Sequence, residues 1–430
     1  MHLKSNMKIS FKIFIAVIVF NFFVGCNSKN KVKLAPVLKP VMTAATILGN
    51  PDYLAISYGG YRHVDHDIEP TIEELKEDMK LLAAMGIKIL RTYKVHLPQA
   101  SNLLAAISEL KKEDASFEMY VMLGAWIDCK NAWTDIAPDH NSESDRNAIE
   151  IATTVALAKK YPGIVKIIAV GNEAMVKWAA SYYVQPNVIL KWVHHLQDLK
   201  KSGALSKDLW ITSSDDFSSW GGGGAEYHTP DLEKLIKAVD YISMHTYAYH
   251  NSHYNPGFWE VPDAEKELSA IEKVDRAMLR AKSFAMTQYN NVKNYMISLG
   301  IDKPIHIGES GWATKSNGFY GQNGSRATDE YKQGLYYQHI REWTNKEKIS
   351  CFYFEAFNEQ WKDAGNPLGS ENHFGLINSE GEAKYPLWEA VDAGIFEGLT
   401  RNGKTITKTY NGDTALLMKD VLVPNTDYKR

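Results

Sequence analysis

The strongest constraint on the fold is a regular alternation along the chain between short β-rich runs and longer segments with helical spacing of apolar residues. The helical spacing is that of Ile72, Leu75 and Met79. The eight β-rich runs are Tyr53–Tyr58, Ile87–Thr92, Phe117–Leu123, Ile164–Val170, Leu209–Ser214, Tyr241–His245, Pro304–Gly308 and Ser350–Phe357. A strand followed by a helix, repeated eight times, predicts an α/β fold in which a parallel sheet closes into a (β/α)8 TIM barrel.

An open, doubly wound sheet is the alternative to the barrel. It is disfavoured because no glycine-rich dinucleotide-binding turn follows the first β-rich run. Two of the helices are expected to begin at capping sequences, one at residues 70–74 and the other at residues 141–144.

Charge and cysteine content exclude several function classes. The 48 Lys and Arg residues nearly balance 51 Asp and Glu residues, so the net charge of −3 gives no reason to expect a nucleic-acid partner. The three cysteines are too few for a disulfide framework and contain no C-x-x-C pair. Cys129 follows the third β-rich run and Cys351 begins the eighth, so we expect free thiols at opposite ends of the barrel.

The N-terminus has the order of a secretory signal. Lys4, Lys8 and Lys12 precede the apolar run Ile13–Phe20, which is too short to span a membrane. Cys26 follows Val-Gly, which resembles a bacterial lipoprotein signal with Cys26 as the lipidated residue. We therefore expect attachment to the outer membrane of the cell envelope, facing the periplasm or the surface, with plain secretion as the alternative.

Two glutamates stand where chemistry is expected in a barrel, at the carboxyl ends of strands. Glu173 follows the run Ile167–Val170, and Glu309 follows Ile305–Gly308. A lone glutamate there often serves only a helix N-terminus, but two on opposite sides of the ring match the needs of glycoside cleavage. That reaction uses one protonated carboxyl to assist the leaving oxygen and one ionised carboxyl to attack or to activate water.

At these residues the chain resembles glycoside hydrolase family 17, the β-1,3-glucan-cleaving branch of the retaining glycosidase clan built on (β/α)8 barrels. The segments that carry the resemblance, over roughly residues 50–395, are Ile56–Gly59, Ile89–Tyr93, Leu123–Trp126, Val170–Glu173, Met244–Tyr249, Gly308–Trp312 and Phe354–Lys362.

The resemblance implies a role for five residues. Glu173 would be the general acid/base and Glu309 the nucleophile. Asn172 would hydrogen-bond the 2-hydroxyl of the sugar at the cleaved bond. Tyr247 and Arg91 would contact Glu309 and favour its ionised form. Packing or a structural ion pair is the alternative for these last two.

Further substrate contacts are expected from the last two motifs. Glu355, Glu359 and Lys362 would contact the glucan or the catalytic pair, unless they are merely a solvated set of charges. Trp312 and Trp361 are predicted to stack on sugar faces. Other tryptophans that follow strands receive no role: Trp126, Trp133, Trp178, Trp220 and Trp259.

Competing chemistries fit less well. Gly308-x-Ser310 begins like a serine-hydrolase elbow, but Trp312 stands where that motif needs glycine. At most one of Asp215 and Asp216 can face the site, because adjacent strand residues point to opposite faces. Histidine groups that could bind a metal are more simply part of aromatic-rich loops, so we expect no metal and no cofactor: His63 with His66, and His245 with His250 and His253.

The expected organisation has four parts: a lipoprotein signal at residues 1–25, a tether at 26–48, the glycoside hydrolase barrel at 49–397 and an extension at 398–430 packed on the barrel. The extension contains two expected short strands, Thr405–Tyr410 and Ala415–Val423. We expect a monomer.

Three functions are compatible with these motifs. The first is a retaining endo-β-1,3-glucanase that acts on laminarin-like glucan by double displacement. The second is a β-1,3-glucan glucanosyltransferase, in which a sugar hydroxyl replaces water. The third is a lipid-anchored glycan-binding protein on a degenerate barrel, which the intact Asn172, Glu173 and Glu309 disfavour.

Overall fold

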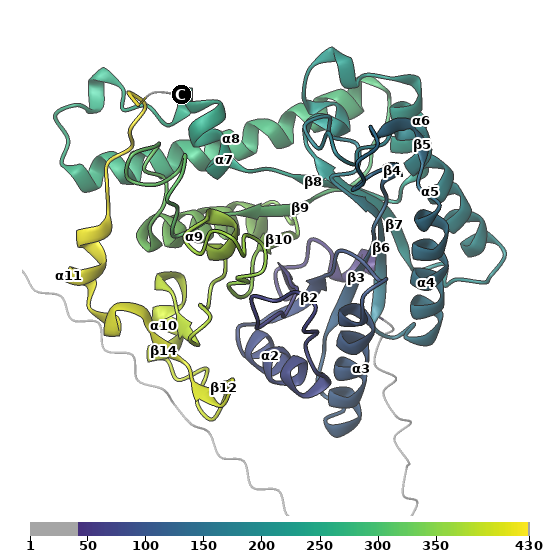
Figure 1. Ribbon diagram of the computed structural model, residues 1–430, viewed down its shortest axis with the longest axis horizontal. Coiled ribbons are helices and arrows are strands. Elements are labelled where there is room, and N and C mark those ends of the chain that lie inside the picture. Colours follow the sequence, from purple (N-terminus) through teal and green to yellow (C-terminus); the bar gives the residue numbers. More distant parts are fainter. Residues whose placement is uncertain (1–41, 429–430) are drawn as a thin grey trace, which may run out of the picture. The chain divides into compact units, whose positions relative to one another are not determined.

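The computed structural model describes residues 42–428, and within them the eight predicted strands close into one parallel barrel (Figure 1). Around the ring the order is β1-β10-β9-β8-β7-β6-β3-β2. The barrel strands are β1 (Leu54–Ser57), β2 (Ile87–Arg91), β3 (Tyr120–Ala125), β6 (Val165–Asn172), β7 (Trp210–Asp216), β8 (Ile242–His245), β9 (Ile305–Gly311) and β10 (Cys351–Phe354). The predicted (β/α)8 TIM barrel is confirmed.

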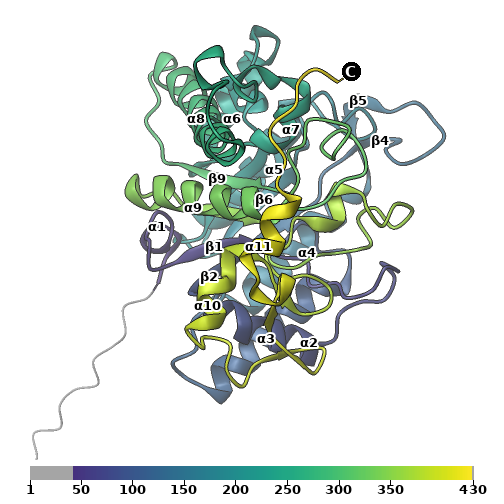
Figure 2. The same ribbon diagram turned by 90° about the vertical axis from the view of Figure 1, so that its left-hand side faces the viewer.

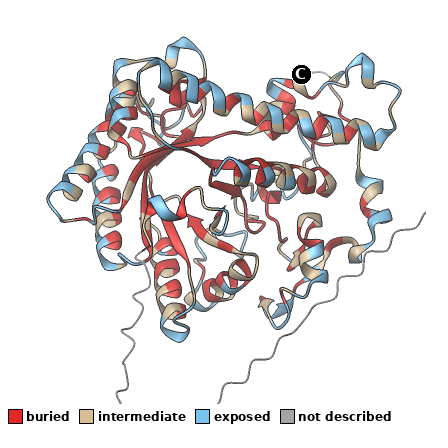
Figure 3. Cartoon of the chain, turned by 180° about the vertical axis from the view of Figure 1, so that it is seen from behind, coloured by how far each residue is buried: buried red, intermediate tan, exposed pale blue. Residues whose placement is uncertain are grey.

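Helices follow every barrel strand and cover its outer surface. They are α2 (Ile72–Ala84), α3 (Pro98–Glu113), α4 (Arg146–Lys160), α5 (Pro186–Lys201), α6 (Pro230–Ala238), α7 (Ala248–Tyr254), α8 (Ala270–Ser298), α9 (Glu330–Lys346) and α10 (Trp388–Asp392). Figure 3 shows their red, buried faces against the strands and their pale blue faces outward. The predicted cap of α2 is present, because Thr71 and Glu74 hydrogen-bond each other's backbone N–H groups.

The core has two parts because successive strand residues point to opposite faces. In β3, Tyr120 and Met122 belong to the cluster inside the barrel, whereas Val121 and Leu123 pack under the helices. The interior cluster also contains Ala55, Ile89, Ile167, Ala169, Tyr241 and Phe352. A filled interior leaves the carboxyl ends of the strands as the place for a site.

The start of the described chain differs from the prediction of a tether over residues 26–48. Residues Ala44–Ile47 form helix α1, which lies beside β1 in Figure 2. Ala44 and Ile47 are fully buried and pack on the interior cluster, because these apolar side chains close the barrel. The remainder of the predicted tether, the signal at residues 1–25 and Cys26 lie outside the described residues.

A second difference concerns residues 141–144, which were expected to cap a helix. Residues Asp139–Glu143 instead form strand β5, which pairs antiparallel with β4 (Cys129–Lys130). This pairing delays the start of α4 to Arg146. The result is a hairpin inserted between β3 and α4, on the carboxyl side of the barrel.

The C-terminal extension packs on the barrel through α2. Short strands β12 (Thr400–Arg401) and β13 (Lys404–Thr405) form a hairpin, and β14 (Thr407–Lys408) pairs with β11 (Glu382–Ala383). The expected strand Ala415–Val423 is wrong, because the Asp413 side chain accepts from the N–H groups of Ala415 and Leu416 and so starts helix α11 (Thr414–Leu417).

Two observations complete the fold. Cys129 and Cys351 are buried free thiols, as expected. Within residues 42–428, no helix combines the length and apolarity needed to cross a membrane.

Candidate active site

The turn that presents Glu173 is tightly constrained. Gly171 has a φ of +82°, and a Cβ there would come within 2.8 Å of the Ala174 side chain. Glu173 itself has a φ of 47°, in the left-handed region that non-glycine residues rarely occupy. Its backbone N–H donates to the carbonyl of Ser214 on β7 at 2.9 Å. The neighbouring strand therefore holds this side chain over the barrel mouth.

Glu309 reaches the same space from β9, on the other side of the barrel. One carboxylate oxygen of Glu173, one of Glu309 and one ring nitrogen of His245 all lie within 4.8 Å of one another. Glu309 is only 5% exposed, and Glu173 is half-buried. The structure thus brings together the two glutamates that the sequence singled out.

Glu309 is surrounded by donors. The Arg91 guanidinium pairs with its Oε1, and the Tyr247 hydroxyl donates to its Oε2 at 2.7 Å. Burial raises the pKa of Glu309, but His245, Arg91 and Tyr247 outweigh burial and hold the pKa at about 2. Burial lowers the pKa of His245 itself to about 4, so above that pH Arg91 supplies the positive charge. Glu309 is therefore ionised near neutrality.

Glu173 has the opposite environment. Burial raises its pKa well above the usual range for a carboxyl, and the negative charges of Glu309 and Asp216 add to that increase. Asp216 therefore contributes to the raised pKa of Glu173. Asp215 instead accepts from the Met175 N–H at 2.7 Å. The carboxyl of Glu173 is the one that holds a proton.

Sequence reasoning did not select His245 as a site residue. Its Nδ1 lies 3.0 Å from Glu173 Oε1 and 3.8 Å from Glu309 Oε2, and its Nε2 lies 2.8 Å from the Ser214 hydroxyl. The signal was available, because His245 precedes Tyr247 by two residues and so shares its face of the strand end.

Asn172 and Arg91 connect the two strand ends. Arg91 Nη1 also donates to the carbonyl of Gly308 at 3.0 Å, and Arg91 Nη2 donates to Asn172 Oδ1. Arg91 is 1% exposed, so these bonds form away from water. One guanidinium therefore fixes both Glu309 and the residue before Glu173.

Glu355, Glu359 and Lys362 form a buried charge cluster rather than a solvated set. Lys362 Nζ pairs with Glu355 and lies 3.3 Å from Glu359 Oε2. Both glutamates are 2% exposed. Burial raises the pKa of Glu355 to about 8, with Lys362 opposing and Glu359 adding to the increase. Their predicted contact with glucan stays a prediction.

The prediction that Trp312 stacks on sugar is wrong, because its ring is completely buried. The indole N–H donates to the Ala327 carbonyl at 2.7 Å, and the ring packs on Tyr249, Trp259 and Tyr336. Strand alternation gives the reason: Glu309 points into the barrel mouth, so Trp312, three residues later, points outward under the helices.

Trp361 is better placed for a ligand. Its ring is half-buried at the rim, with its centroid 3.9 Å from His66 and 5.5 Å from Tyr61. Lys94 Nζ lies 5.7 Å from the same centroid. A sugar ring has an apolar face and hydroxyl groups at its edge. A partly exposed indole can stack on that face while the neighbouring cation contacts the hydroxyl groups.

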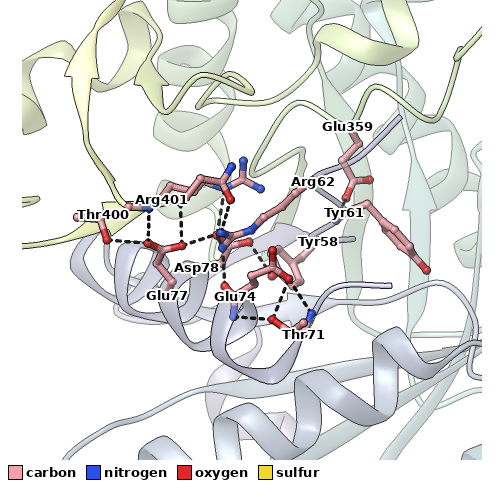
Figure 4. A network of polar contacts seen from close by, with 12 residues as sticks. Tyr58, Tyr61, Arg62, Thr71, Glu74, Glu77, Asp78, Glu359, Thr400 and Arg401 are labelled. Carbon is pink, nitrogen blue, oxygen red and sulfur yellow. Dashed lines mark hydrogen bonds and ion pairs between the residues drawn. The ribbon is translucent and has the colours of Figure 1, made fainter. Parts of the chain in front are cut away.

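Figure 4 shows a second polar network, which lies between α2, the loop after β1 and the C-terminal extension. The buried Asp78 on α2 accepts from Tyr58, Arg62 and Arg401 at 2.9, 2.8 and 3.0 Å. Arg62 also donates to Glu77 at 2.7 Å. The two arginines balance the two carboxylates, so the network ties the C-terminal extension and the loop after β1 to α2 without a net charge.

The network leads to the eighth-strand cluster. The Arg401 guanidinium lies 4.1 Å from the centroid of Phe357, and Glu359 accepts from the Tyr61 N–H at 3.0 Å. A Cβ at Gly59 would come within 2.3 Å of Glu359 Oε1, so glycine leaves room for this carboxylate. A cavity of about 440 Å³ between α2 and residues 398–402 is lined mainly by charged side chains and lies away from the carboxyl pair.

Glu173, His245 and Glu309 are also the described residues whose atoms are close enough to ligate a metal. Arg91, which is 1% exposed, already balances the negative charge of Glu309. A second positive charge at that carboxylate is therefore disfavoured. The expectation that no metal takes part stays a prediction.

Among solved structures, the chain is similar to an endo-laminarinase from Formosa Hel1_33_131. The two are 64% identical with a TM-score of 0.89, over 90% of this chain and 100% of that one. A glycoside hydrolase family 17 β-1,3-glucanosyltransferase from Rhizomucor miehei is 20% identical, with a TM-score of 0.51 over 78% of this chain and 96% of that one, and shares the fold.

Curated relatives are more distant. The protein btgC of Aspergillus niger is 24% identical over 349 residues, which are 79% of this chain and 42% of that protein, so the chain spans less than half of btgC. The glucan 1,3-beta-glucosidase of Arthroderma benhamiae is 23% identical over 265 residues, 59% of this chain and 68% of that protein. Residues 55–375 match the BtgE/BtgC glycoside hydrolase domain, and the chain belongs to that family.

Proposed function

We propose that this chain is an endo-β-1,3-glucanase that hydrolyses laminarin-like glucan. The observation that carries the proposal is its 64% identity to the Formosa endo-laminarinase across the whole of that chain. The motifs around Glu173 and Glu309 further support membership of glycoside hydrolase family 17.

The proximity of the two carboxyls supports a retaining mechanism. Retaining glycosidases hold their carboxyl groups about 5–5.5 Å apart, whereas inverting ones leave about 6.5–9.5 Å for a water. The nearest oxygens of Glu173 and Glu309 lie within 4.8 Å of each other, which favours direct attack by one carboxylate.

In the first step, the Glu309 carboxylate attacks the anomeric carbon and the bond from that carbon to the glycosidic oxygen breaks. Glu173 gives its proton to this oxygen, so the leaving chain departs with a new hydroxyl. Glu309 is then esterified to the sugar. The pKa of about 2 at Glu309 and the raised pKa at Glu173 provide the required protonation states near neutrality.

In the second step, water gives a proton to Glu173 while its oxygen attacks the anomeric carbon, and the ester bond to Glu309 breaks. Both carboxyls regain their starting states and the product keeps the β configuration. Because Arg91 engages the Asn172 oxygen, the amide nitrogen of Asn172 is the atom left to donate to the sugar 2-hydroxyl. Glu355, Glu359, Trp361 and Lys362 are proposed to line the groove beyond this sugar.

Glucanosyl transfer is the second candidate, because it shares the ester at Glu309. The half-buried Trp361 beside Tyr61 and His66 would hold a sugar near the site, and a bound acceptor competes with water. In dilute oligosaccharide we expect hydrolysis to dominate, with longer products appearing only as the concentration rises.

The test is to incubate the protein with laminarin, mixed-linkage glucan and a β-1,4-glucan while measuring reducing ends and viscosity. We expect laminarin to lose viscosity before many reducing ends appear, which indicates internal cleavage, and Glu309→Ala to be inactive. Products longer than the starting oligomer in dilute substrate would favour the transferase. Binding of laminarin without any turnover would favour a glycan-binding protein.

We also propose that Cys26 is lipidated and anchors the protein to the outer membrane. The basic residues, apolar run and Val-Gly-Cys order of the N-terminus support this proposal. Cys26→Ser should convert a membrane-associated protein into a soluble one with unchanged kcat and KM. A wild-type protein that is released without detergent would instead indicate plain secretion.

A further inference from the structure

We propose that Trp126, Trp133 and Tyr182, here called the three-ring cluster, form a binding subsite for one glucosyl unit of the glucan, away from the bond that is cleaved. The proposal rests on the proposed function. It adds a site on the hairpin between β3 and α4, which no resemblance or comparison assigns.

The three rings face one another at the carboxyl side of the barrel. The Trp133 and Tyr182 rings are stacked, with centroids 5.0 Å apart and planes 22° apart. Trp126 lies 5.3 Å from Tyr182 and 6.4 Å from Trp133. Trp133 is 56% exposed although its neighbours are partly covered. The exposed ring of Trp133 therefore presents an aromatic surface to solvent, supported by the other two rings.

The backbone indicates that this exposure is built into the hairpin. Trp133 has a φ of 62°, which is unfavourable for a bulky residue, and the preceding turn also holds Asn131 at a φ of 64°. Exposing an indole contributes little to folding, so a strained position that does so is more readily explained by a ligand than by stability.

A buried carboxylate lies close to the two indoles. Asp128 is 2% exposed and pairs with Arg146 at 2.9 Å. Burial raises its pKa, while Arg146, Ser144, Trp133 and Trp126 counteract that increase.

The hairpin is also fixed to the loop that carries Tyr182. The Cys129 N–H donates to the Tyr182 carbonyl at 3.0 Å, and the His140 ring stacks on Tyr183 at 3.6 Å. The rings are thus held in place before a ligand binds, which reduces the entropy lost on binding.

The cluster is continuous with the catalytic centre. Trp126 directly follows Ala125 of β3, which pairs with Val170, three residues before Glu173. Burial raises the pKa of Tyr182, and the charges of Glu173, Asp215 and Glu309 add to it, so its hydroxyl lies within electrostatic reach of both catalytic carboxyls. A glucan chain that occupies the carboxyl pair and extends past Glu173 would meet these rings.

The chemistry of the rings selects the ligand. The C–H face of a β-glucosyl unit is flat and apolar while its edge carries hydroxyls, which matches an indole face bordered by polar groups in a wet groove. A long glucan would gain this contact and a short one that ends at the carboxyl pair would not. The subsite therefore determines chain-length preference.

The experiment compares Trp133→Asn with Trp133→Phe, using laminari-oligosaccharides of increasing length. Asparagine tolerates the left-handed backbone and removes the ring, whereas phenylalanine keeps an aromatic face. Trp178→Asn is the matched control, because Trp178 is 64% exposed and makes no ring contact among the described residues. Thermal melts establish that each variant is folded.

We expect Trp133→Asn to raise KM for long oligosaccharides by about 3- to 10-fold, with kcat changed by less than about twofold and the shortest cleaved oligomer unaffected. Trp133→Phe should recover most of the loss, and Trp178→Asn should match the wild type. Calorimetry with laminarihexaose on Glu309→Ala, with and without Trp133→Asn, should show the same weakening without turnover.

An unchanged KM at every length would overturn the subsite, as would an equal loss on the shortest oligomer or an equal loss in Trp178→Asn. If the exposed Trp133 ring instead bound another protein, its substitution would likewise leave KM unchanged. These outcomes are distinct from failure of the proposed function, in which the wild type itself would not cleave laminarin.

Discussion

The ends of β6 and β9 each present one glutamate to the same small space, but they surround it differently. At β9, Glu309 receives a guanidinium and a phenol, and its pKa is about 2. At β6, Glu173 receives burial and neighbouring negative charge, and its pKa is raised. One residue type therefore acquires two protonation states at one pH, which is the condition for acid and nucleophile to work together.

The difference lies in the donors rather than in burial, since desolvation raises the pKa of both carboxyls. The Glu355 carboxyl, directly after the neighbouring strand β10, illustrates the balance. It also contacts a cation, Lys362, but Glu359 shares that cation, and the pKa of Glu355 rises to about 8. Lys362 lowers the pKa of Glu355, but burial and the second carboxylate outweigh that effect.

The largest expected effect separates the two strand ends by mutation. Glu309→Ala should lower kcat on laminarin and on an activated aryl laminaribioside by roughly 10⁴-fold or more, because no ester can form. Glu173→Ala should be comparably poor on laminarin but keep the first step on the aryl substrate, whose leaving group needs no proton. Equal losses on both substrates in both variants would contradict the assigned difference.

Removing the Arg91 cation should make the environment of the Glu309 carboxyl more like that of Glu173. Arg91→Met should raise the pKa of Glu309 from about 2 and lower kcat/KM by about 10²-fold, with the acidic limb of the pH–rate profile moving to higher pH. Arg91→Lys is the matched variant, because it keeps the charge but loses the fork to Asn172. An acidic limb that does not move in Arg91→Met would exclude Arg91 as the source of the low pKa.

A smaller effect is expected from the phenol. Tyr247→Phe removes the donor to Glu309 Oε2 and should lower kcat by about 10-fold, with a smaller upward shift of the same acidic limb. Tyr336→Phe is the control, because its hydroxyl bonds the adjacent Ser310 at 2.8 Å rather than a carboxyl. If the two variants shift the limb equally, the effect belongs to packing behind β9.

The smallest effect concerns stability near β6. Burial raises the pKa of Asp215 to about 7, above its unfolded value of about 3.9, so its favourable contribution is complete below about pH 4 and is lost as the pH rises through about 7. Asp215→Asn keeps one acceptor, for the Met175 N–H, but turns its amide NH2 toward the Asp216 N–H, so its Tm relative to the wild type should be about 1–3 °C higher at pH 8 than at pH 4. Equal Tm changes at the two pH values would mean that Asp215 does not titrate in this range.

The alternation of β-rich and helical segments was enough to predict the barrel, because each of its strands is a short β-rich run followed by a helical segment. It also placed Glu173 and Glu309, since residues just after such runs lie at the carboxyl rim. Strand residues alternate between two faces, and this alternation would also have predicted that His245 lies on the same face as Tyr247 and that Trp312 points away from the groove.

Other features depend on contacts that sequence spacing does not contain. The pairing of Asp139–Glu143 with Cys129–Lys130 overrides a good capping sequence, and helix α1 forms because Ala44 and Ile47 fill the end of the barrel. Likewise, the low pKa of Glu309 depends on Arg91, which lies 218 residues earlier in the chain. Long-range packing decided each of these outcomes.

The most direct test of the two roles is the configuration of the glycosyl azide formed from an activated aryl laminaribioside. In Glu173→Ala, azide should attack the ester at Glu309 and give the β-azide. In Glu309→Ala, azide should replace the missing nucleophile and give the α-azide. NMR of the anomeric proton distinguishes the two products. The reverse pattern, an α-azide from Glu173→Ala and a β-azide from Glu309→Ala, would show that the acid and the nucleophile have been exchanged.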